Sequence, residues 1–514
     1  MRNFSCRRPR RPAAEVAGVR HSLLFVVGLV VGLAAGAGGV LALRPPATPA
    51  GGADFALLQE IDRTIESHYY VPVKASGLRA GAIDGLTSAL GDPYTVYYTK
   101  AAYERVVHDP RGRYGGVGVE VDKVLQGVEV EGVFPNTPAA KAAMQPGDVL
   151  LEVNGHPTQG WSVDEVADAL RGAPGSTVSL VLERGGNLYR LRLRRATIPV
   201  IPTASAQMLP GGIGFVRVSE MSASAAQAFR AALKKLAPDH PRAYVLDLRD
   251  DPGGDTAQAV AIARDIIPHG TLATLVGRRF PRAVYTSESG RSLGAPLVVL
   301  VNSSTASAAE ILAAAIAENG DGTLMGTRTY GKGVAQELFP LGADGYLALT
   351  VAQWLTPRGA SIQGRGIEPG YVVAGSEAPL AAAATYLGQP TALRSTLRTG
   401  QAWLTAAGRR EALDVAPVVQ GGRLYLSAVG VEQATGVEAT FDAATKSVTL
   451  RLGRQVLDLV LGSASGRLDG RAMAVAAPKE IGGQPLVPAQ DLVLAFHVRL
   501  QDLGRGSFAL TTSF

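Results

Sequence analysis

Residues 22–43 are the stretch that most constrains how this chain can fold. They read SLLFVVGLVVGLAAGAGGVLAL, which is 22 residues without a charged side chain. As a helix rising 1.5 Å per residue, the stretch spans roughly 30 Å, which matches the hydrocarbon core of a bilayer. A buried helix of a soluble domain is seldom apolar on every side and this rich in glycine. We therefore expect residues 22–43 to form a transmembrane segment.

The positive charge of the chain is concentrated beside this segment. Residues 1–44 contain seven arginines against one acidic residue, Glu15, and carry the whole formal net charge of +6. Positive residues that flank a membrane segment stay on the cytoplasmic side, which predicts a cytoplasmic N-terminus and an exported remainder. The balanced charge of residues 45–514 disfavours a nucleic-acid-binding surface.

The N-terminal segment and the cysteine content together predict the compartment. The apolar stretch is longer than a signal-peptide core, and no clean Ala-x-Ala site precedes Arg44. A retained anchor is therefore favoured over a cleaved signal, which would leave the protein secreted. The single cysteine, Cys6, lies on the predicted cytoplasmic side and excludes a disulfide framework or a cysteine-built zinc site. We expect a single-pass membrane protein whose larger part is extracytoplasmic.

Changes in residue pattern divide the rest of the chain. Apolar residues at helical spacing, such as Leu58, Ile61 and Ile65, give way to short alternating strands. Strand-like and helix-like runs then alternate, which predicts an α/β core, so the expected fold class is multidomain α/β and β. In chain order we expect a basic cytoplasmic segment (1–21), the anchor (22–43), a linker (44–52), a helical segment (53–110), a β-rich domain (111–196), the α/β core (197–387), a second linker (388–409) and a small accessory domain (410–514).

Glycine-rich turns mark the domain at 111–196. Gly115-Gly116-Val117-Gly118-Val119 opens it, and Pro146-Gly147-Asp148-Val149-Leu150 and Val153-Asn154-Gly155 follow in order. These motifs resemble a PDZ domain. In that family the glycine-rich loop offers N–H groups to the C-terminal carboxylate of a peptide, which then adds as a strand to the sheet edge. The resemblance implies that peptide is bound by Gly116, Val117, Gly118 and Val119.

Three short stretches of the α/β core combine small, polar and glycine residues. Ser307, in the second stretch, begins a predicted helix. The N–H groups in the first turn of that helix point outward and form the positive end of the helix dipole. A serine at this position is usually only a helix cap, but such N–H groups also suit an oxyanion beside a nucleophile. The stretches are Asp247-Leu248-Arg249-Asp250-Asp251-Pro252-Gly253-Gly254, Val301-Asn302-Ser303-Ser304-Thr305-Ala306-Ser307-Ala308-Ala309-Glu310-Ile311 and Thr329-Tyr330-Gly331-Lys332-Gly333-Val334-Ala335-Gln336.

A nucleophilic serine needs a base, and two candidates are open. None of the seven histidines lies in these stretches, although His240 precedes the strand that leads to Asp247. Lys332 lies between Gly331 and Gly333, where a lysine is more often an exposed turn residue. It can act as a base only if burial lowers its pKa from about 10.4 towards neutrality. A Ser–Lys pair is a known variant of the catalytic triad.

Residues 326–333 also come close to the phosphate-binding loop G-x-x-x-x-G-K-[ST]. However, Gly333 stands where that motif needs the hydroxyl that holds magnesium. The residues that follow are strand-like, whereas the motif requires a helix. We therefore expect no nucleotide to bind there.

The three stretches occur in order behind a helical segment and a PDZ-like domain, and together they resemble the carboxyl-terminal processing (tail-specific) serine peptidases. The resemblance runs from about residue 53 to 387. The usual Asn-Asn before Pro-Gly-Gly is here Asp250-Asp251. The resemblance implies no metal and no other cofactor. It implies a nucleophile, Ser307, a base, Lys332, a residue that orients the base, Gln336, and oxyanion donors from Ala308 and from Gly253 or Gly254.

The implied function is a membrane-anchored serine endopeptidase that cleaves exported proteins near their C-termini. The PDZ domain would hold the substrate tail by its free carboxylate, and a homodimer is the expected assembly. One alternative is a catalytically inactive, membrane-tethered PDZ adaptor, against which the complete set of Ser307, Lys332 and Gln336 argues. A second alternative is a serine hydrolase that uses His240 as its base.

Residues 410–514 return to short alternating segments. The phrase Phe441-Asp442-Ala443-Ala444-Thr445-Lys446-Ser447-Val448-Thr449-Leu450 resembles the small module named after the N-terminal domain of copper amine oxidases. His497 stands alone in this region, without the cluster of ligands that a copper ion requires. We therefore expect an accessory domain without copper.

Overall fold

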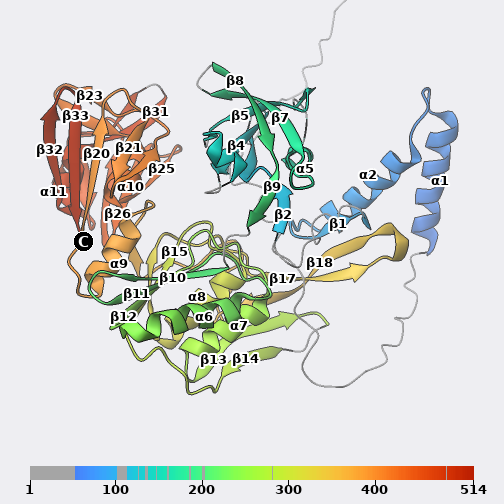
Figure 1. Ribbon diagram of the computed structural model, residues 1–514, viewed down its shortest axis with the longest axis horizontal. Coiled ribbons are helices and arrows are strands. Elements are labelled where there is room, and N and C mark those ends of the chain that lie inside the picture. Colours follow the sequence, from blue (N-terminus) through green and yellow to red (C-terminus); the bar gives the residue numbers. More distant parts are fainter. Residues whose placement is uncertain are drawn as a thin grey trace, which may run out of the picture. The chain divides into compact units, whose positions relative to one another are not determined.

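The structure, a computed structural model, contains two compact units (Figure 1). The described part of residues 109–200 makes one unit, and the described residues before and after it make the other. The predicted anchor at 22–43 lies outside the described residues, and no helix within the described part is long and apolar enough to cross a membrane. The structure describes residues 52–100, 103, 113–124, 127–133, 137–145, 147–158, 161, 163–184, 187–199, 203–279, 282–481 and 483–514.

The first unit is built around an antiparallel sheet in the order β3-β4-β5-β7-β8, with the short β6 paired to β5. Apolar and polar residues alternate along β7, where Val178, Leu180 and Leu182 are buried and Thr177 and Ser179 are exposed. The short strands predicted for this region are confirmed, and two helices lie among them. They are β2 (Arg113–Gly116), β3 (Val119–Val124), β4 (Gly127–Val133), β5 (Val149–Val153), β6 (His156–Pro157), β7 (Thr177–Arg184), β8 (Asn187–Arg194) and β9 (Ala196–Pro199), with α4 (Pro138–Lys141) and α5 (Val163–Leu170).

A six-stranded sheet in the order β10-β11-β12-β15-β16-β19 forms the centre of the second unit. The strands from β11 to β19 are parallel, and β10 is antiparallel to β11. Because parallel strands present their carboxyl ends at one edge, the segments that follow β12 and β15 meet there. The elements are β10 (Ala204–Leu209), β11 (Ile213–Val218), β12 (Ala243–Asp247), β15 (Leu297–Val301), β16 (Thr323–Gly326) and β19 (Tyr371–Val372), with α6 (Ala225–Leu236), α7 (Thr256–Ile266) and α8 (Ala308–Asn319).

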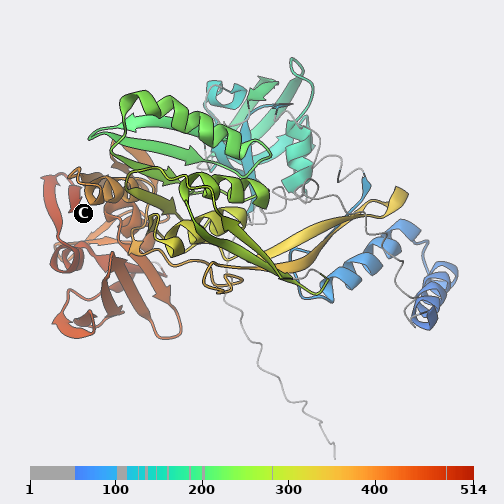
Figure 2. The same ribbon diagram turned by 90° about the horizontal axis from the view of Figure 1, so that it is seen from below.

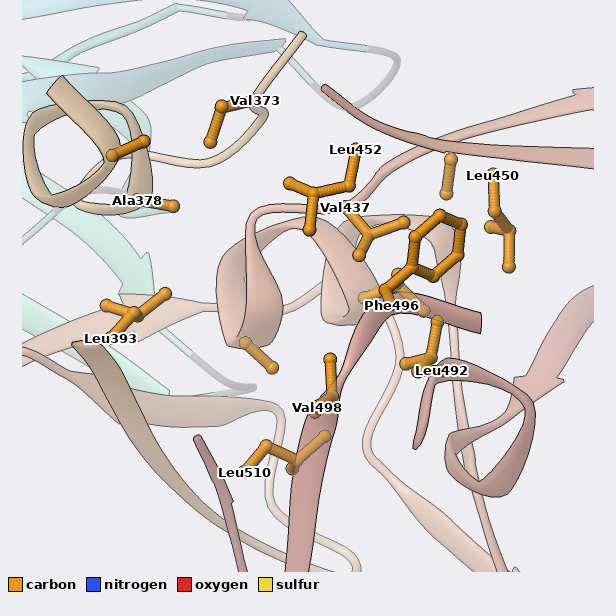
Figure 3. Packing of buried hydrophobic residues seen from close by; sticks show 14 of the residues in the cluster. Val373, Ala378, Leu393, Val437, Leu450, Leu452, Leu492, Phe496, Val498 and Leu510 are labelled. Carbon is orange, nitrogen blue, oxygen red and sulfur yellow. The ribbon is translucent and has the colours of Figure 1, made fainter. Parts of the chain in front are cut away.

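Side chains of β15 show that both faces of this sheet are covered. All five residues of β15 are buried. Leu297, Val299 and Val301 pack in the cluster made with α6, α7 and α8, whereas Val298 and Leu300 pack on the opposite face. That face is covered by α9 (Ala378–Tyr386) and by residues 392–514, the C-terminal module, in one continuous cluster that Figure 3 shows in part. A strand that is apolar at every position is typical of a sheet buried on both sides.

A second sheet joins the helical segment to the core. The long strand β18 pairs along most of its length with β17, and its other edge pairs with β1 at the start of the strand and with β13 at the end (Figure 2). The helices predicted for 53–110 are confirmed as α1 (Gly52–His68) and α2 (Ala75–Ser88), and β1 is an addition that the helical prediction lacks. The strands are β1 (Val96–Tyr98), β13 (Gly270–Gly277), β14 (Ala283–Ser287), β17 (Val334–Pro340) and β18 (Tyr346–Leu355).

The linker predicted at 388–409 is wrong, because most of these residues are strands of the C-terminal module. β20 (Ala392–Arg398) and β21 (Trp403–Ala406) belong to a five-stranded sheet that also contains β33 (Ser507–Ser513). The reason is visible in β20, where buried Leu393, Ser395 and Leu397 alternate with exposed Arg394, half-buried Thr396 and exposed Arg398. The module also contains α10 (Ala428–Thr435), β26 (Ser447–Leu452), α11 (Ala489–Phe496) and β32 (Val498–Gly504).

Candidate active site

Ser307 lies between β15 and α8 in a backbone conformation that side-chain-bearing residues rarely adopt. Its φ is +53° and its ψ is −119°. Two hydrogen bonds tie the residues before it to the loop after β12: the Thr305 hydroxyl donates to the Leu248 carbonyl over 2.8 Å, and the Ala306 N–H donates to the Asp251 carbonyl over 2.9 Å. Strain of this kind persists only where the surroundings enforce it, and it often marks a functional residue.

Gly253 is the predicted oxyanion residue that packs directly against this serine. A Cβ placed on Gly253, whose φ is +91°, would lie 2.8 Å from the Cβ of Ser307 and 2.9 Å from the amide nitrogen of Ala308. Gly254 instead packs against Met221, where a Cβ would lie 2.6 Å from the carbonyl oxygen. Close approach of the backbone therefore requires glycine at both positions, but only Gly253 adjoins the Ser307–Ala308 peptide.

The N–H of Gly253 already has a partner. It donates to Oδ1 of Asp251 over 2.8 Å, and Asp251 is fully buried. Burial raises the pKa of the Asp251 carboxyl well above its usual value, and its Oδ2 has no hydrogen-bond partner among the described residues. An oxyanion that uses the Gly253 N–H must compete with this carboxyl oxygen.

Glu310 holds the serine and the lysine segments together, and sequence analysis assigns it no role. Its side chain is fully buried, and its Oε2 accepts from the N–H groups of both Ser307 and Lys332, each over 2.8 Å. Its Oε1 accepts from the Gly331 N–H over 2.7 Å and from the Thr329 hydroxyl over 2.5 Å. Burial raises the pKa of Glu310, and these four donors oppose the shift. The spacing Ser307-x-x-Glu310, which is that of a capping box, was the available signal.

Lys332 is buried, whereas the lysine of a Gly-Lys-Gly turn is usually exposed. Its exposed fraction is 6%, and burial lowers its pKa to about 8, against the opposing effects of Asp92 and Glu310. Gly331 and Gly333 are required by packing, because a Cβ on either would lie 2.7 Å from a backbone nitrogen of residues 362–366. The burial that a lysine base requires is therefore present.

The turn after α2 supplies two neighbours of Lys332 that sequence analysis missed. The Nζ of Lys332 lies 4.9 Å from the centre of the Tyr94 ring, which is a cation–π distance. Asp92 accepts from the Thr95 hydroxyl over 2.6 Å and from the Tyr94 N–H over 3.1 Å. Burial raises the pKa of Tyr94 to about 12, so this phenol is neutral at physiological pH. No local pattern links this turn to a lysine more than 200 residues away.

Gln336 lies in β17, four residues beyond Lys332. Its Nε2 donates to the Thr350 hydroxyl over 3.0 Å. Its Oε1 is buried and has no hydrogen-bond partner within the described residues. A buried amide oxygen without a hydrogen-bond partner costs free energy. An ammonium or a substrate group that donates to this oxygen would remove the cost.

The position of His240 argues against it as the base. His240 is exposed and precedes β12, whereas Asp247 is the last residue of that strand. The five residues of β12 span roughly 16 Å, so the two ends lie at opposite edges of the sheet. Nor do the described residues contain a group of three or more histidine, cysteine, aspartate or glutamate side chains that could hold a metal ion.

In the first unit the predicted peptide-binding loop links β2 to β3. Gly116 ends β2, and the carbonyl of Val117 accepts from the Ala139 N–H of α4 over 2.9 Å. Gly118 has a φ of +84°, and a Cβ there would collide with Thr137. Val119 begins β3, which is the terminal strand of its sheet within the described residues. The loop is therefore closely packed, and it leads into an edge strand of the kind to which a peptide strand adds.

Comparisons with known families cover most parts of the chain. The pattern of peptidase family S41 matches residues 212–373, and that of the PDZ domain matches residues 129–184. The activating protease CtpB N-terminal domain matches residues 47–102, and the copper amine oxidase N-terminal domain matches residues 405–502.

Individual proteins show the same likeness. The carboxy-terminal processing protease CtpA of Bacillus subtilis (strain 168) is 32% identical over 358 residues, which cover 68% of this chain and 77% of that protein. A carboxyl-terminal-processing protease of Synechocystis sp. (strain ATCC 27184 / PCC 6803 / Kazusa) is 35% identical, with 57% and 70% covered. Among solved structures, a photosystem II D1 C-terminal processing protease is 29% identical over 61% of this chain and 91% of that one, with a TM-score of 0.43.

Proposed function

The chain belongs to the carboxy-terminal processing proteases of peptidase family S41, and on that basis we propose that Ser307 and Lys332 form its catalytic dyad. One observation carries the proposal. The backbone N–H groups of both residues bind the same oxygen of Glu310, each over 2.8 Å, so the two nitrogens lie at most twice that distance apart. The burial of Lys332 supports its role as a base, because a lysine with a pKa of about 8 is about one-tenth neutral at pH 7.

In the proposed reaction the neutral amine of Lys332 takes the proton from the Ser307 hydroxyl as its oxygen attacks the scissile carbonyl. The tetrahedral oxyanion is stabilised by the N–H groups of Ala308 and Gly253. When the C–N bond breaks, the Lys332 ammonium protonates the departing amine and an acyl-enzyme remains. Lys332 then deprotonates a water molecule, which attacks the ester, and the proton returns to the serine oxygen.

Two neighbours of the dyad have proposed positioning roles. The unpaired Oε1 of Gln336 accepts a hydrogen bond from the Lys332 ammonium that forms during attack, which lowers the cost of charging a buried amine. Gly253 turns its N–H from Asp251 to the oxyanion, since a charged acceptor makes the stronger hydrogen bond.

Protein substrates are recognised, in this proposal, by the PDZ domain. The loop Gly116-Val117-Gly118-Val119 receives the terminal carboxylate, and the substrate tail pairs with β3. Binding the tail raises the concentration of the adjoining chain at the dyad, so cleavage falls near the substrate's C-terminus. A reporter peptide with an amidated C-terminus is expected to be cleaved with a higher KM than the same peptide with a free carboxylate.

We further propose that residues 22–43 anchor the enzyme in the cell membrane with its catalytic part outside the cytoplasm. The uncharged stretch and the arginines before it support this orientation. The full chain is expected in the membrane fraction after an alkaline wash and accessible to external protease. A chain without residues 2–43 is expected to be soluble, and recovery of this shorter chain in the membrane fraction contradicts the anchor.

The helical segment is the proposed interface for a second copy of the chain. Leu57, Leu58 and Ile61 of α1 and Leu86 and Leu90 at α2 are each more than two-fifths exposed, although their spacing is that of a buried helix face. Light scattering is expected to give the mass of a dimer, and Leu58→Glu with Ile61→Glu the mass of a monomer. Glu60→Gln in the same helix is the matched control.

The experiment that tests the dyad compares three variants on a peptide reporter. Ser307→Ala and Lys332→Ala are each expected to lose cleavage by at least about a thousandfold, as when a nucleophile or its base is removed. Ser303→Ala alters an exposed serine of the same loop and should cleave as the wild type does. A serine-reactive probe should label the wild type and not Ser307→Ala.

Two results oppose the proposal. Comparable turnover in Lys332→Ala overturns the dyad. If the wild type binds the tail peptide but neither cleaves it nor reacts with the probe, the chain is the inactive PDZ adaptor instead.

A further inference from the structure

The C-terminal module packs on the rest of the second unit, here called the catalytic unit, and the two share one hydrophobic core. Val373 and Ala378 of the catalytic unit lie in the same cluster as Val437, Leu452 and other residues of the module (Figure 3). The contact is tight, because a Cβ added to Gly436 would lie 2.6 Å from the Cβ of Ala378. The module therefore holds a fixed place on the sheet, unlike a domain joined by a flexible linker.

Helix α10 of the module holds the loop of residues 374–377, which links β19 to α9. The Ala374 N–H donates to the Gly436 carbonyl over 2.8 Å. Ser376 donates both its N–H and its hydroxyl to Oε1 of Gln433, over 3.2 and 3.3 Å. Gly375 packs closely on the same helix, because a Cβ at this position would lie only 2.6 Å from the carbonyl oxygen of Glu432. The conformation of this loop thus depends on contacts from the module.

The same loop contacts the oxyanion segment, residues 247–254, through the side chain of Arg249. The Nη1 of Arg249 donates to the carbonyl of Ser376. Its Nε and Nη2 donate to the two carboxylate oxygens of Asp247, each over 2.8 Å, which is the bidentate geometry of a strong arginine–carboxylate pair. The Arg249 side chain is only 12% exposed, and that of Asp247 is fully buried. A buried guanidinium with these partners has little freedom to move.

Contacts on the other side of the oxyanion segment come from the catalytic unit itself. Asp250 is held by Arg217 over 3.1 Å and by the Asn302 amide over 2.7 Å, and its φ is +62°. These bonds act on Asp250, whereas Arg249 connects the start of the segment to Ser376. The segment that carries Gly253 is therefore braced from two directions, one of which leads to the module.

From this chain of contacts we propose that the C-terminal module positions the oxyanion loop, with Arg249 as the positioning residue that transmits its effect. The module holds Ser376 through Gln433, Ser376 holds Arg249, and Arg249 holds the start of the segment that ends at Gly253. The effect on catalysis rests on the proposed function, in which the Gly253 N–H stabilises the oxyanion. The effect on the loop itself does not.

The first test compares Gln433→Ala with Gln501→Ala in the full chain. Gln501 is an exposed glutamine in β32 of the same module and is the matched control. Loss of the Ser376 hydrogen bonds is expected to lower kcat about fivefold with KM unchanged, as for a contact worth about one hydrogen bond that acts only on the transition state. Gln501→Ala should keep the wild-type kcat. Equal kcat in the two variants overturns the proposal.

The second test asks whether Gln433 acts through Arg249. Arg249→Lys keeps the charge but cannot bind Asp247 and Ser376 together, so it is expected to lower kcat more than Gln433→Ala does. If the contacts form one chain, adding Gln433→Ala to Arg249→Lys causes no further loss. A double variant that loses the product of the two separate factors shows that the module acts by another route.

A readout without catalysis separates this inference from the proposed function. Hydrogen exchange is measured on peptides that span residues 247–255, in a Ser307→Ala background. Gln433→Ala is expected to speed exchange there at least threefold, and Gln501→Ala is expected to leave it unchanged. Faster exchange without any wild-type cleavage would keep the structural link and refute the proposed function. Unchanged exchange in Gln433→Ala overturns the link even if the enzyme is active.

Discussion

At the scale of single residues, the protonation of Lys332 governs the proposed chemistry. Burial lowers its pKa to about 8, and the nearby carboxylates of Asp92 and Glu310 limit that decrease. The base acts in its neutral form, so kcat/KM should rise with pH through the pKa of Lys332. Asp92 comes from the turn before β1, far from Lys332 in the sequence but close enough to influence its charge. A substitution of Asp92 can therefore change the pKa of Lys332 without replacing the lysine.

Asp92→Asn is expected to move the rising limb of the kcat/KM profile to lower pH. Removing the negative charge removes an influence that raises the pKa of Lys332, while the asparagine keeps an oxygen for the Tyr94 N–H. The measurement is kcat/KM between pH 6 and pH 10, with exposed Asp84→Asn in α2 as the control. A limb that stays in place, or that moves to higher pH, contradicts the assignment of Lys332 as the base.

Asp251→Asn is expected to make stability less dependent on pH. In the folded protein, burial raises the pKa of Asp251 well above its value of 3.8 in the unfolded chain. Its favourable contribution is complete below pH 3.8 and is lost as the pH rises through the folded pKa, because ionisation of the buried carboxyl costs free energy. Urea unfolding at several pH values should show the wild type losing stability relative to Asp251→Asn over that range. Parallel curves would mean that Asp251 does not titrate there.

The site residues differ in how visible they are in the sequence. Ser307, Lys332 and Gly253 belong to compact motifs, so the resemblance to a known family could propose roles for them from the chain alone. Glu310 is hidden because a helix cap explains its spacing equally well. Asp92 and Tyr94 are hidden for a different reason: they reach Lys332 only because β1 pairs with β18, and a local pattern contains no record of such a long-range pairing.

At the scale of elements, prediction succeeded where a segment buries a regular face. β15 is apolar throughout, as a strand of the predicted α/β core should be, and β7 alternates as a half-buried strand should. β20 falls in the predicted linker, where Arg394, Ser395 and Thr396 separate its two leucines and Arg398 follows them. Those arginines lie on the exposed face, so the segment is an ordinary amphipathic strand whose partner, β33, comes at the far end of the chain.

Leu397→Ala tests the status of β20 as a strand of the module's core. Its side chain is 4% exposed, so truncation is expected to lower the free energy of unfolding by about 2–4 kcal/mol, through lost burial and the cavity that remains. Arg394→Ala in the same strand alters an exposed side chain and should change stability by less than about 0.5 kcal/mol. Similar small effects in both variants would restore the linker interpretation.

At the scale of the whole molecule, the central sheet of the second unit and the C-terminal module are expected to fold together. Val298 and Leu300 of the central sheet are buried in one cluster with the leucines of the C-terminal module. A chain that ends at Leu387 keeps α9 but exposes the part of this face that the module covers. We expect it to be insoluble or to lack a cooperative thermal transition, whereas a chain that begins at residue 52 should unfold cooperatively. A cooperative transition in the shortened chain, near that of the full chain, would show that the module is dispensable for folding.

The pairing of β1 with β18 has a consequence for timing. A ribosome releases Asp92 and Tyr94 about 240 residues before it releases Lys332, and the segment that holds Ser376 in place comes later still. Strand β1 therefore remains without its partner strand while the PDZ domain and most of the catalytic sheet are made. Until the final strand, β33, has emerged, the nascent chain lacks part of the scaffold on which its proteolytic centre is assembled. The proposed proteolytic centre is therefore completed only after almost the whole chain has been made.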